Sequence, residues 1–369
     1  MRLAILVGRF PPEAIGGAEI QASKLAKHLA KEHSVVVLTR RFRGLPRREE
    51  REGYTIYRHR SFGLPGLRVL SAIATGVLSV FRLRKNIDVL VCYQIVTSGL
   101  IGALAQRLFG VPAAVWIRGE TEYKQEAALD YRLATPFVLK TAKVVLVQTE
   151  RIRQDMLAEM AARCGEAYAK KLEPRTFVVR NGVDLPDQPP AESRDGVFYV
   201  GRLFDFKGVQ YLLAAARQEP SWKVTIIGDG PDRKRLERLA QGQPASFKGA
   251  LPHAEVVRSV AGSKVLVLPS LSGDGLPNVL LEALSLGVPV VSTTTAGIPD
   301  VIRDGEFGYL APPGNAGAIR AAVDKLLGDE TLWKCMSANA SKEARRYSWD
   351  TVSGSLLNVF SRVKMGARR

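Results

Sequence analysis

The sequence predicts an α/β protein made of two doubly wound parallel-sheet domains that face each other across a cleft. Three observations lead to this fold class. The chain has 369 residues, which is more than one hydrophobic core usually supports. Short apolar strands alternate with helical stretches in both halves, a pattern typical of parallel sheets covered on both faces. A polar, proline-rich stretch at residues 185–195 separates the two runs.

The expected elements follow in chain order. The first half contains apolar strand patterns at residues 3–7, 35–39, 55–58, 89–93, 114–117, 144–147 and 176–179, with helical periodicity at 18–31, 98–109 and 152–161. The second half repeats the plan with strands at residues 197–200, 223–227, 245–248, 265–268, 288–292 and 308–310. We therefore expect Rossmann-like domains at residues 1–187 and 188–346, with a C-terminal helix in residues 349–369 that packs back on the first domain.

The charge is concentrated in the first half. Residues 1–185 hold 30 Lys and Arg against 17 Asp and Glu, a net +13, out of +17 for the whole chain. Such a basic surface predicts an anionic partner. Zinc-ligand spacing, RNA-binding motifs and basic runs interleaved with aromatics are all missing from the sequence, so nucleic acid is not the expected partner.

Residues 67–83 form an apolar helix with a narrow polar stripe and basic flanks. Only thirteen residues separate Arg68 from Arg82, too few to span a bilayer. Two interpretations fit: a helix lying in the interface of an anionic membrane, and a core helix beside a solvated basic loop. We favour the first. The three cysteines lie far apart and the N-terminus lacks a signal-peptide cleavage region, so we expect a cytoplasmic protein, peripheral on the inner face of the membrane.

Cationic and glycine motifs follow the strands of the second half. Arg202 and Lys207 come directly after the first of these strands, where an arginine fork and a lysine point charge suit a diphosphate. Gly228 and Gly230 follow the next strand and allow a ligand to approach the backbone closely. Taken alone, each motif also fits an ordinary turn.

An acidic pair brackets a helix start. Asp274 precedes a Gly-Leu-Pro-Asn turn, and Glu282 lies one turn into the helix that follows. The helix N-terminus is an anion site, and the two carboxylates can bind hydroxyl groups on either side of a bound phosphate. The arrangement therefore suits a nucleotide-diphosphate sugar. The residues expected to line this donor site are Leu276, Pro277, Asn278, Val279 and Leu280.

The first half has weaker motifs. Gly16 and Gly17 open the first helix, where paired glycines can cradle a phosphate. The pattern is not Gly-x-Gly-x-x-Gly, and no ribose-binding acid ends the second strand, so a nicotinamide dinucleotide is not expected, although the arginines there leave NADP formally open. All four histidines are interpreted as structural.

These motifs, together with the Asn-Gly-Val-Asp run at 181–184, Phe-Lys-Gly at 247–249 and Ala-Gly-Ile-Pro-Asp at 296–300, closely resemble the retaining GT-B glycosyltransferases of family 4 over nearly the whole chain. The resemblance implies metal-independent transfer, without a cofactor, of a sugar from a nucleotide donor to a glycan or lipid-linked acceptor. It also implies that Arg202 and Lys207 hold the diphosphate, that Asp274 contacts the sugar, and that Glu282 contacts the ribose.

Two departures from the family pattern stand out. Asp274 occupies a position where the family usually has a glutamate. After the fifth expected strand, where many members place a histidine, this chain has Arg118, followed by Glu120. Arg118 cannot act as a base at neutral pH but can bind phosphate, and Glu120 can supply the polar contact instead. A structural Arg–Glu pair at the strand end is the alternative interpretation.

Three functions are therefore weighed. The leading one is a glycosyltransferase that extends a lipid-linked or polysaccharide acceptor. A sugar-nucleotide epimerase on the same fold is the alternative within enzymes. A non-catalytic module that binds a nucleotide or a glycan is the third, but the combined presence of Arg202, Lys207 and Glu282 argues against it.

Overall fold

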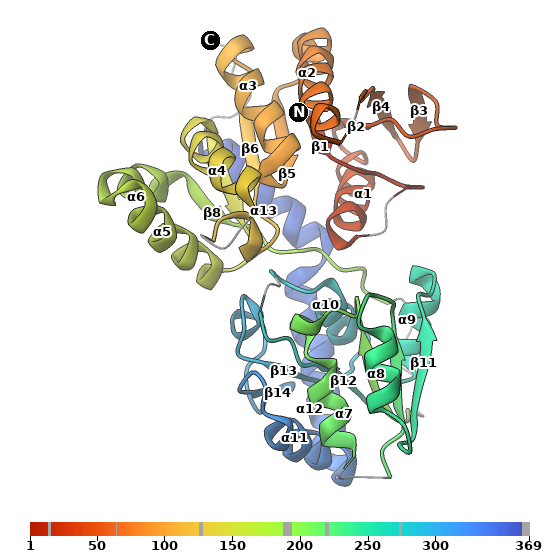
Figure 1. Ribbon diagram of the computed structural model, residues 1–369. Coiled ribbons are helices and arrows are strands. Elements are labelled where there is room, and N and C mark those ends of the chain that lie inside the picture. The colour runs from red at the N-terminus through yellow and green to blue at the C-terminus, as the bar shows by residue number, and fades with distance from the viewer. Residues whose placement is uncertain are drawn as a thin grey trace. The chain divides into compact units, whose positions relative to one another are not determined.

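The structure, a computed structural model, describes residues 1–13, 16–63, 65–124, 128–186, 194–217, 221–272 and 275–363, and the chain forms two compact units (Figure 1). The N-terminal unit comprises Met1–Gly182 and Trp349–Arg369, and the C-terminal unit comprises Val183–Ser348. The division at Gly182 lies a few residues before the boundary expected at residue 187. Each unit is a largely parallel sheet with helices on both faces, which confirms the predicted fold class.

The N-terminal unit contains an eight-stranded sheet in the order β3-β4-β2-β1-β5-β6-β7-β8. All neighbouring pairs are parallel except β3 and β4. The strands are β1 (Arg2–Val7), β2 (Ser34–Arg40), β3 (Arg48–Arg51), β4 (Tyr54–His59), β5 (Val89–Tyr93), β6 (Ala113–Trp116), β7 (Val144–Val147) and β8 (Thr176–Val178). The strand order reverses direction between β1 and β5, and such a switch point leaves a crevice at the carboxyl edge of the sheet.

Helices cover both faces of this sheet. One face packs against α1 (Gly17–Leu29) and against α13 (Trp349–Arg362), which comes from the C-terminal end of the chain. The other face packs against α2 (Pro65–Leu83), α3 (Leu100–Phe109), α4 (Leu129–Thr141), α5 (Glu150–Cys164) and α6 (Glu166–Leu172). The central strands are buried on both faces, which explains their continuous runs of valine, leucine and isoleucine.

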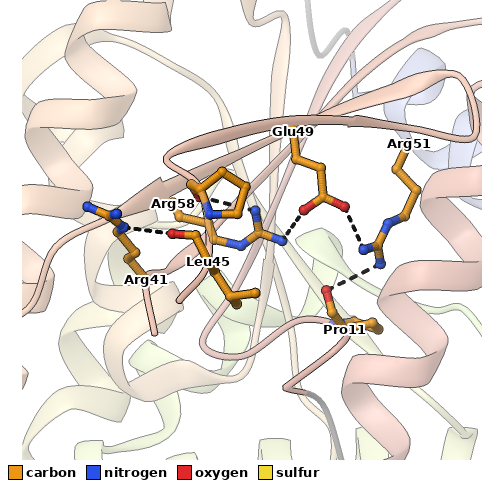
Figure 2. A network of polar contacts seen from close by, with 7 residues as sticks. Pro11, Arg41, Leu45, Glu49, Arg51 and Arg58 are labelled. Atoms are coloured by element: carbon orange, nitrogen blue, oxygen red, sulfur yellow. Dashed lines mark hydrogen bonds and ion pairs between the residues drawn. The ribbon is translucent and has the colours of Figure 1, made fainter. Parts of the chain in front are cut away.

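The edge strand β3 was not predicted, because its four residues are all charged. An internal ion-pair network explains why it forms (Figure 2). Glu49 lies between the guanidinium groups of Arg58 and Arg51, at 2.7 and 2.6 Å, and the side chain of Arg58 is fully buried. Burial by itself would raise the pKa of Glu49, but the hydrogen bonds from Arg58 and Arg51 hold that pKa below its ordinary value. The paired charges thus satisfy each other beneath the hairpin.

The C-terminal unit contains a six-stranded parallel sheet in the order β11-β10-β9-β12-β13-β14. The strands are β9 (Val197–Val200), β10 (Val224–Ile227), β11 (Ala245–Gly249), β12 (Val265–Leu268), β13 (Val290–Thr293) and β14 (Gly308–Ala311). One face packs against α7 (Val209–Ala216), α8 (Arg233–Leu239) and α11 (Ala316–Gly328), and the other against α9 (His253–Ala261), α10 (Asn278–Ser285) and α12 (Glu330–Ala344). Its switch point lies between β9 and β12.

Candidate active site

The predicted cations of the C-terminal unit lie in the loop after β9. Arg202 is exposed, and its guanidinium carbon lies 5.1 Å from the centroid of the Phe204 ring. The Lys207 ammonium lies 5.4 Å from the centroid of the Phe206 ring, and the two rings lie 5.6 Å apart. Aromatic faces attract cations, so this ring pair restrains both side chains at the carboxyl edge of the sheet.

Two neighbouring loops are joined to this one through their backbones. Leu203 donates its N–H to the carbonyl of Asp229 at 2.9 Å and accepts from the N–H of Asp232 at 3.1 Å. A side chain at Gly228, whose φ is +138°, would collide with the Gly201 carbonyl, and one at Gly230 would collide with the Leu203 carbonyl. The predicted glycines are therefore needed for loop-to-loop contact, whatever ligand they also approach.

The loop after β12 joins the same edge. The N–H of Leu271 donates to the Phe206 carbonyl at 2.8 Å, and a side chain at Gly208 would collide with the Pro269 carbonyl. Loops that follow β9, β10 and β12 therefore meet at the switch point, where open α/β sheets bind ligands.

The predicted anion turn follows, although Asp274 lies outside the described residues. Pro277 precedes the first residue of α10, Asn278, and a buried Leu276 anchors the turn. Val279 is half-buried and Leu280 fully buried, so their side chains pack into the core and only their backbone N–H groups suit a ligand. The predicted helix N-terminus is present at the carboxyl edge of the sheet.

Glu282 has a partner that the sequence did not reveal. The Nε2 atom of His253 lies 2.9 Å from the Glu282 carboxylate, and the Glu282 side chain is mostly buried. His253 begins α9, which follows β11. The imidazole positions a carboxylate oxygen, and the other carboxylate oxygen has no hydrogen bond to a described residue. This pairing is consistent with the predicted role of Glu282 as a hydroxyl ligand, and it gives His253 a place beside the candidate site.

In the N-terminal unit, Arg118 lies at the end of β6 and is held on three sides. Its Nη2 donates to Asn181 Oδ1 at 2.7 Å, and its guanidinium lies 5.0 and 5.1 Å from the ring centroids of Trp116 and Tyr93. Its Nε and Nη1 atoms are buried and have no partner among the described residues. Burial lowers the pKa of Arg118, yet arginine stays charged in proteins. Two free donors on a fixed cation suit an anionic oxygen.

The turn that holds Arg118 is itself fixed. Gln148 Nε2 also donates to Asn181 Oδ1, at 2.8 Å. Gln21 exchanges two hydrogen bonds with the backbone of Gly182, at 2.7 and 2.9 Å. Because α1 carries Gln21, these contacts position the start of α1 relative to the turn. Gly16 precedes this helix and Gly17 begins it, as predicted.

The acidic partner expected near Arg118 is Glu122 rather than Glu120. Glu120 is buried and pairs with Lys124 at 2.5 Å, and it makes no hydrogen bond or ion pair with Arg118 in the described part of the chain. Glu122 accepts hydrogen bonds from the backbone N–H of Arg118 at 2.7 Å and of Ile95 at 2.8 Å. Burial raises the pKa of Glu122 to about 7, although these two hydrogen bonds act in the opposite direction. The alternative of a structural Arg118–Glu120 pair is therefore not seen among the described residues, whereas a role of Glu120 as a polar contact to the donor stays a prediction.

Two further observations concern metals and membranes. The part of the chain that the structure describes holds no cluster of His, Cys, Asp or Glu side chains suited to a metal ion. Among the same residues, no helix is both long and apolar enough to cross a bilayer.

Comparisons with known proteins cover both units. The family described as "Glycosyl transferases group 1" matches residues 184–346, and the "Glycosyl transferase 4-like domain" matches residues 16–164. Sulfoquinovosyl transferase SQD2 of Arabidopsis thaliana is 29% identical over 236 residues, which make up 60% of this chain and 45% of that protein. Alpha-D-kanosaminyltransferase of Streptomyces kanamyceticus is 27% identical, with 97% of each chain aligned.

Among solved structures, Alr3699/HepE of Anabaena, in complex with UDP and glucose, matches with a TM-score of 0.78. The match is 18% identical and covers 98% of this chain and 99% of that one. At this level of identity the likeness establishes the arrangement of the chain, and the chemistry has to be argued from the residues.

Proposed function

We propose that this chain, which belongs to the group 1 glycosyltransferases of the GT-B fold, transfers a sugar from a nucleotide-diphosphate sugar to a hydroxyl of a lipid-linked or polysaccharide acceptor. The proposed transfer retains the configuration at the anomeric carbon and needs no metal ion. The observation that carries the proposal is the meeting of three loops at the switch point of the C-terminal sheet. They bring Arg202 and Lys207 to the same edge as the glycine loop and the start of α10.

The proposed chemistry needs little from the protein beyond charge and position. The bond between the anomeric carbon and the diphosphate oxygen breaks, and a bond to the acceptor hydroxyl oxygen forms on the same face. A leaving diphosphate oxygen takes the hydroxyl proton, so the products are the glycosylated acceptor and a nucleoside diphosphate. Arg202 and Lys207 stabilise the negative charge that grows on the leaving group. Asp274 and Glu282 are proposed to hold the hydroxyls of the sugar and the ribose.

Product analysis tests this function. Purified protein is incubated with nucleotide sugars of several bases, with and without a membrane extract as the acceptor source, and the nucleotide and sugar products are identified by NMR. Transfer predicts release of nucleoside diphosphate that depends on the extract, and a product of unchanged anomeric configuration. A changed sugar nucleotide without extract would establish an epimerase, and unchanged donor under all conditions would favour the non-catalytic module.

A peripheral membrane position on the cytoplasmic face is part of the proposal, and α2 supports it. Two hydroxyl side chains of this helix contact the loop before it: Ser71 bonds to the backbone of Phe62, and Thr75 bonds to the carbonyl of Arg60. One set of large apolar side chains faces outward, with Leu67 61% exposed and Leu70 64% exposed. An exposed apolar helix face of this kind marks an interaction surface.

Cations lie on and beside this helix. Its exposed arginines without an ion pair to a described residue are Arg68 and Arg82, and Arg60, in the loop that Thr75 contacts, is exposed and likewise unpaired among those residues. Arg48 and Arg58, by contrast, are paired within the hairpin. Basic residues around an apolar helix suit a surface of anionic lipid.

Vesicle sedimentation tests this part. We expect the protein to pellet with phosphatidylglycerol vesicles at low salt, less at high salt, and little with pure phosphatidylcholine. Leu70→Asp should weaken the binding, whereas the matched exposed leucine of α4, Leu133→Asp, should not. Equal binding of both variants would remove α2 as the docking element.

A further inference from the structure

A cavity of about 210 Å³ lies in the N-terminal unit, and its lining includes none of the candidate residues of the C-terminal unit. Its lining comes from residues at the carboxyl ends of β1, β2, β4 and β5, together with the first half of α2. It therefore occupies the switch point of this sheet, where ligands of doubly wound folds bind. Pockets for whole drug-sized ligands start at roughly 300 Å³, so this cavity suits one small group of a ligand.

Two guanidinium groups line the cavity without a carboxylate partner among the described residues. Arg9 and Arg40 both line it, and both stack on the ring of Phe42, at 5.9 and 4.7 Å from its centroid. Neither arginine has an ion pair with a described residue, although many other arginines of this unit do. Burial lowers the pKa of Arg40, and the positive charges of Arg9 and Arg68 lower it further. Such mutual repulsion is relieved when an anion enters.

A buried histidine in the cavity lining has no hydrogen-bond partner. His59 is only 7% exposed, and neither of its ring nitrogens contacts a polar atom of the described residues. Leaving a buried polar group unsatisfied costs about 1–3 kcal/mol, so a ligand that bonds to this ring would remove that cost. Burial, followed by the charge of Arg40, lowers the pKa of His59 to about 4. At neutral pH the ring is uncharged and offers one N–H donor and one acceptor.

The remaining polar lining is held in an unusual backbone. Gln94 and Thr97 both line the cavity and both have positive φ, at 73° and 63°. For a β-branched residue such as threonine this conformation is strained, and strain of this kind concentrates at ligand sites. Ser98, 2% exposed, lies beside them. Glu19 is the one carboxylate among the lining residues, so the lining stays net positive.

We propose that this cavity binds a phosphate group of the acceptor, with Arg9 and Arg40 holding its oxygens and His59 donating to one of them. The inference rests on the proposed function, because it names the chemistry of the acceptor in that reaction. A neutral glycan would leave two stacked arginines uncompensated, whereas a phosphate accepts charge-assisted hydrogen bonds from both. The phosphate belongs either to a lipid headgroup or to a water-soluble sugar phosphate.

Titration of the full-length protein with glycerol 1-phosphate, followed by NMR or calorimetry, tests the cavity directly. The titration is done in the Arg202→Ala, Lys207→Ala background, so that the C-terminal unit contributes no phosphate binding. We expect glycerol 1-phosphate to bind and glycerol not to bind. Arg40→Gln should weaken the affinity by about 10-fold or more, as expected for a lost charge-assisted hydrogen bond. His59→Gln should weaken it less.

Arg43→Gln is the matched control, because Arg43 is an exposed arginine three residues along that does not line the cavity. Arg9→Gln is a second test, since Arg9 is exposed and its replacement leaves the fold intact even where Arg40→Gln does not fold. Equal affinities in Arg9→Gln, Arg40→Gln and Arg43→Gln would overturn the proposal, as would equal binding of glycerol and its phosphate.

A second arm identifies the source of the phosphate. Phosphatidylcholine vesicles with phosphatidic acid are compared with soluble glycerol 1-phosphate, at a salt concentration that suppresses general attraction to anionic lipid. A lipid source predicts that Arg40→Gln loses vesicle binding while Arg43→Gln keeps it. A soluble source predicts that only the glycerol 1-phosphate affinity changes. Failure of the proposed function would appear separately, because the protein with Arg202 and Lys207 intact would then bind no nucleoside diphosphate.

Discussion

The two units share one architecture but assemble their polar groups in different ways. In the C-terminal unit the candidate cations are local: Arg202, Lys207 and the rings that restrain them lie within one loop. In the N-terminal unit, Arg118 is held by Asn181, 63 residues further along the chain. The candidate cations of the C-terminal unit can therefore be found from a short motif, whereas the polar groups of the N-terminal unit come together only after folding. Changes in the two units should therefore fail differently.

The largest effect is expected for Arg202→Ala. If Arg202 stabilises charge on a leaving diphosphate, turnover should fall by about 10²–10³-fold, the usual loss for one preorganised donor. Steady-state kinetics with the donor found by product analysis measure it. Lys342→Ala is the control, since Lys342 is an exposed lysine on α12 without an ion pair among the described residues, and it should leave turnover unchanged. Similar turnover in both variants would remove the assigned role.

A second change tests the backbone of the C-terminal site. Gly228→Ala should lower stability by about 1–3 kcal/mol, because the methyl group meets the Gly201 carbonyl and φ is positive. Nucleotide affinity should fall with it. Gly242→Ala, also at positive φ but with open space around it, should cost less. Denaturant unfolding compares the two, and an equal loss would show that the loops tolerate a side chain.

In the N-terminal unit, Arg118→Lys should separate charge from geometry. Lysine keeps the charge but loses the stacking on Tyr93 and Trp116 and the fork that reaches Asn181. We expect turnover to fall by about 10-fold, with nucleoside diphosphate affinity little changed and with thermal stability close to wild type. Unchanged turnover would assign Arg118 a purely structural role, which the sequence left open.

The smallest effect concerns Glu122 and pH. The folded protein keeps the Glu122 proton up to about pH 7, whereas the unfolded chain releases it near the ordinary value of 4.5. The free energy of unfolding should therefore fall as pH rises from 4.5 to 7 and level off above. Glu122→Gln should remove this slope and cost about 1 kcal/mol, because an amide oxygen accepts only one of the two N–H groups.

Unfolding at pH 5 and pH 8 measures this difference. His59 has a pKa lowered to about 4 and contributes the opposite slope, since its stabilisation is lost as pH falls from 6.5 towards 4. Subtracting the variant from the wild type isolates Glu122. An unchanged slope in the variant would show that Glu122 is ionised in the folded state.

Most of the fold was predictable because buried parallel strands are continuous apolar runs. Each expected strand is present within two residues of its predicted bounds. The exception, β3, has no apolar residue, and its formation depends on the pairing of Glu49 with Arg58 and Arg51. Helix α2 was predicted at its correct position, but which face lies outward was not, because the contacts of Ser71 and Thr75 with the preceding loop are tertiary.

The candidate site also has a part that the sequence predicts and a part that appears only in the structure. The cations and glycines of the C-terminal unit lie where the motifs placed them, because turn and helix start are local properties. Sequence reasoning missed the contact between His253 and Glu282, which joins two helices. It also considered a structural pair of Arg118 with Glu120, whereas Glu122 is the carboxylate that reaches the Arg118 backbone, because spacing along a turn does not say which side chain points inward. The cavity at His59 and Arg40 has no motif at all.

The central claim is that the C-terminal unit holds a nucleoside diphosphate through Arg202. Calorimetric titration of UDP, GDP, ADP and CMP without added metal, into wild type, Arg202→Ala and Lys342→Ala, tests it most directly. We expect one nucleoside diphosphate to bind. Arg202→Ala should weaken this binding at least about 10-fold, as a lost charge-assisted hydrogen bond should, and Lys342→Ala should not. Binding of none of them, or equal binding by all three proteins, would contradict it.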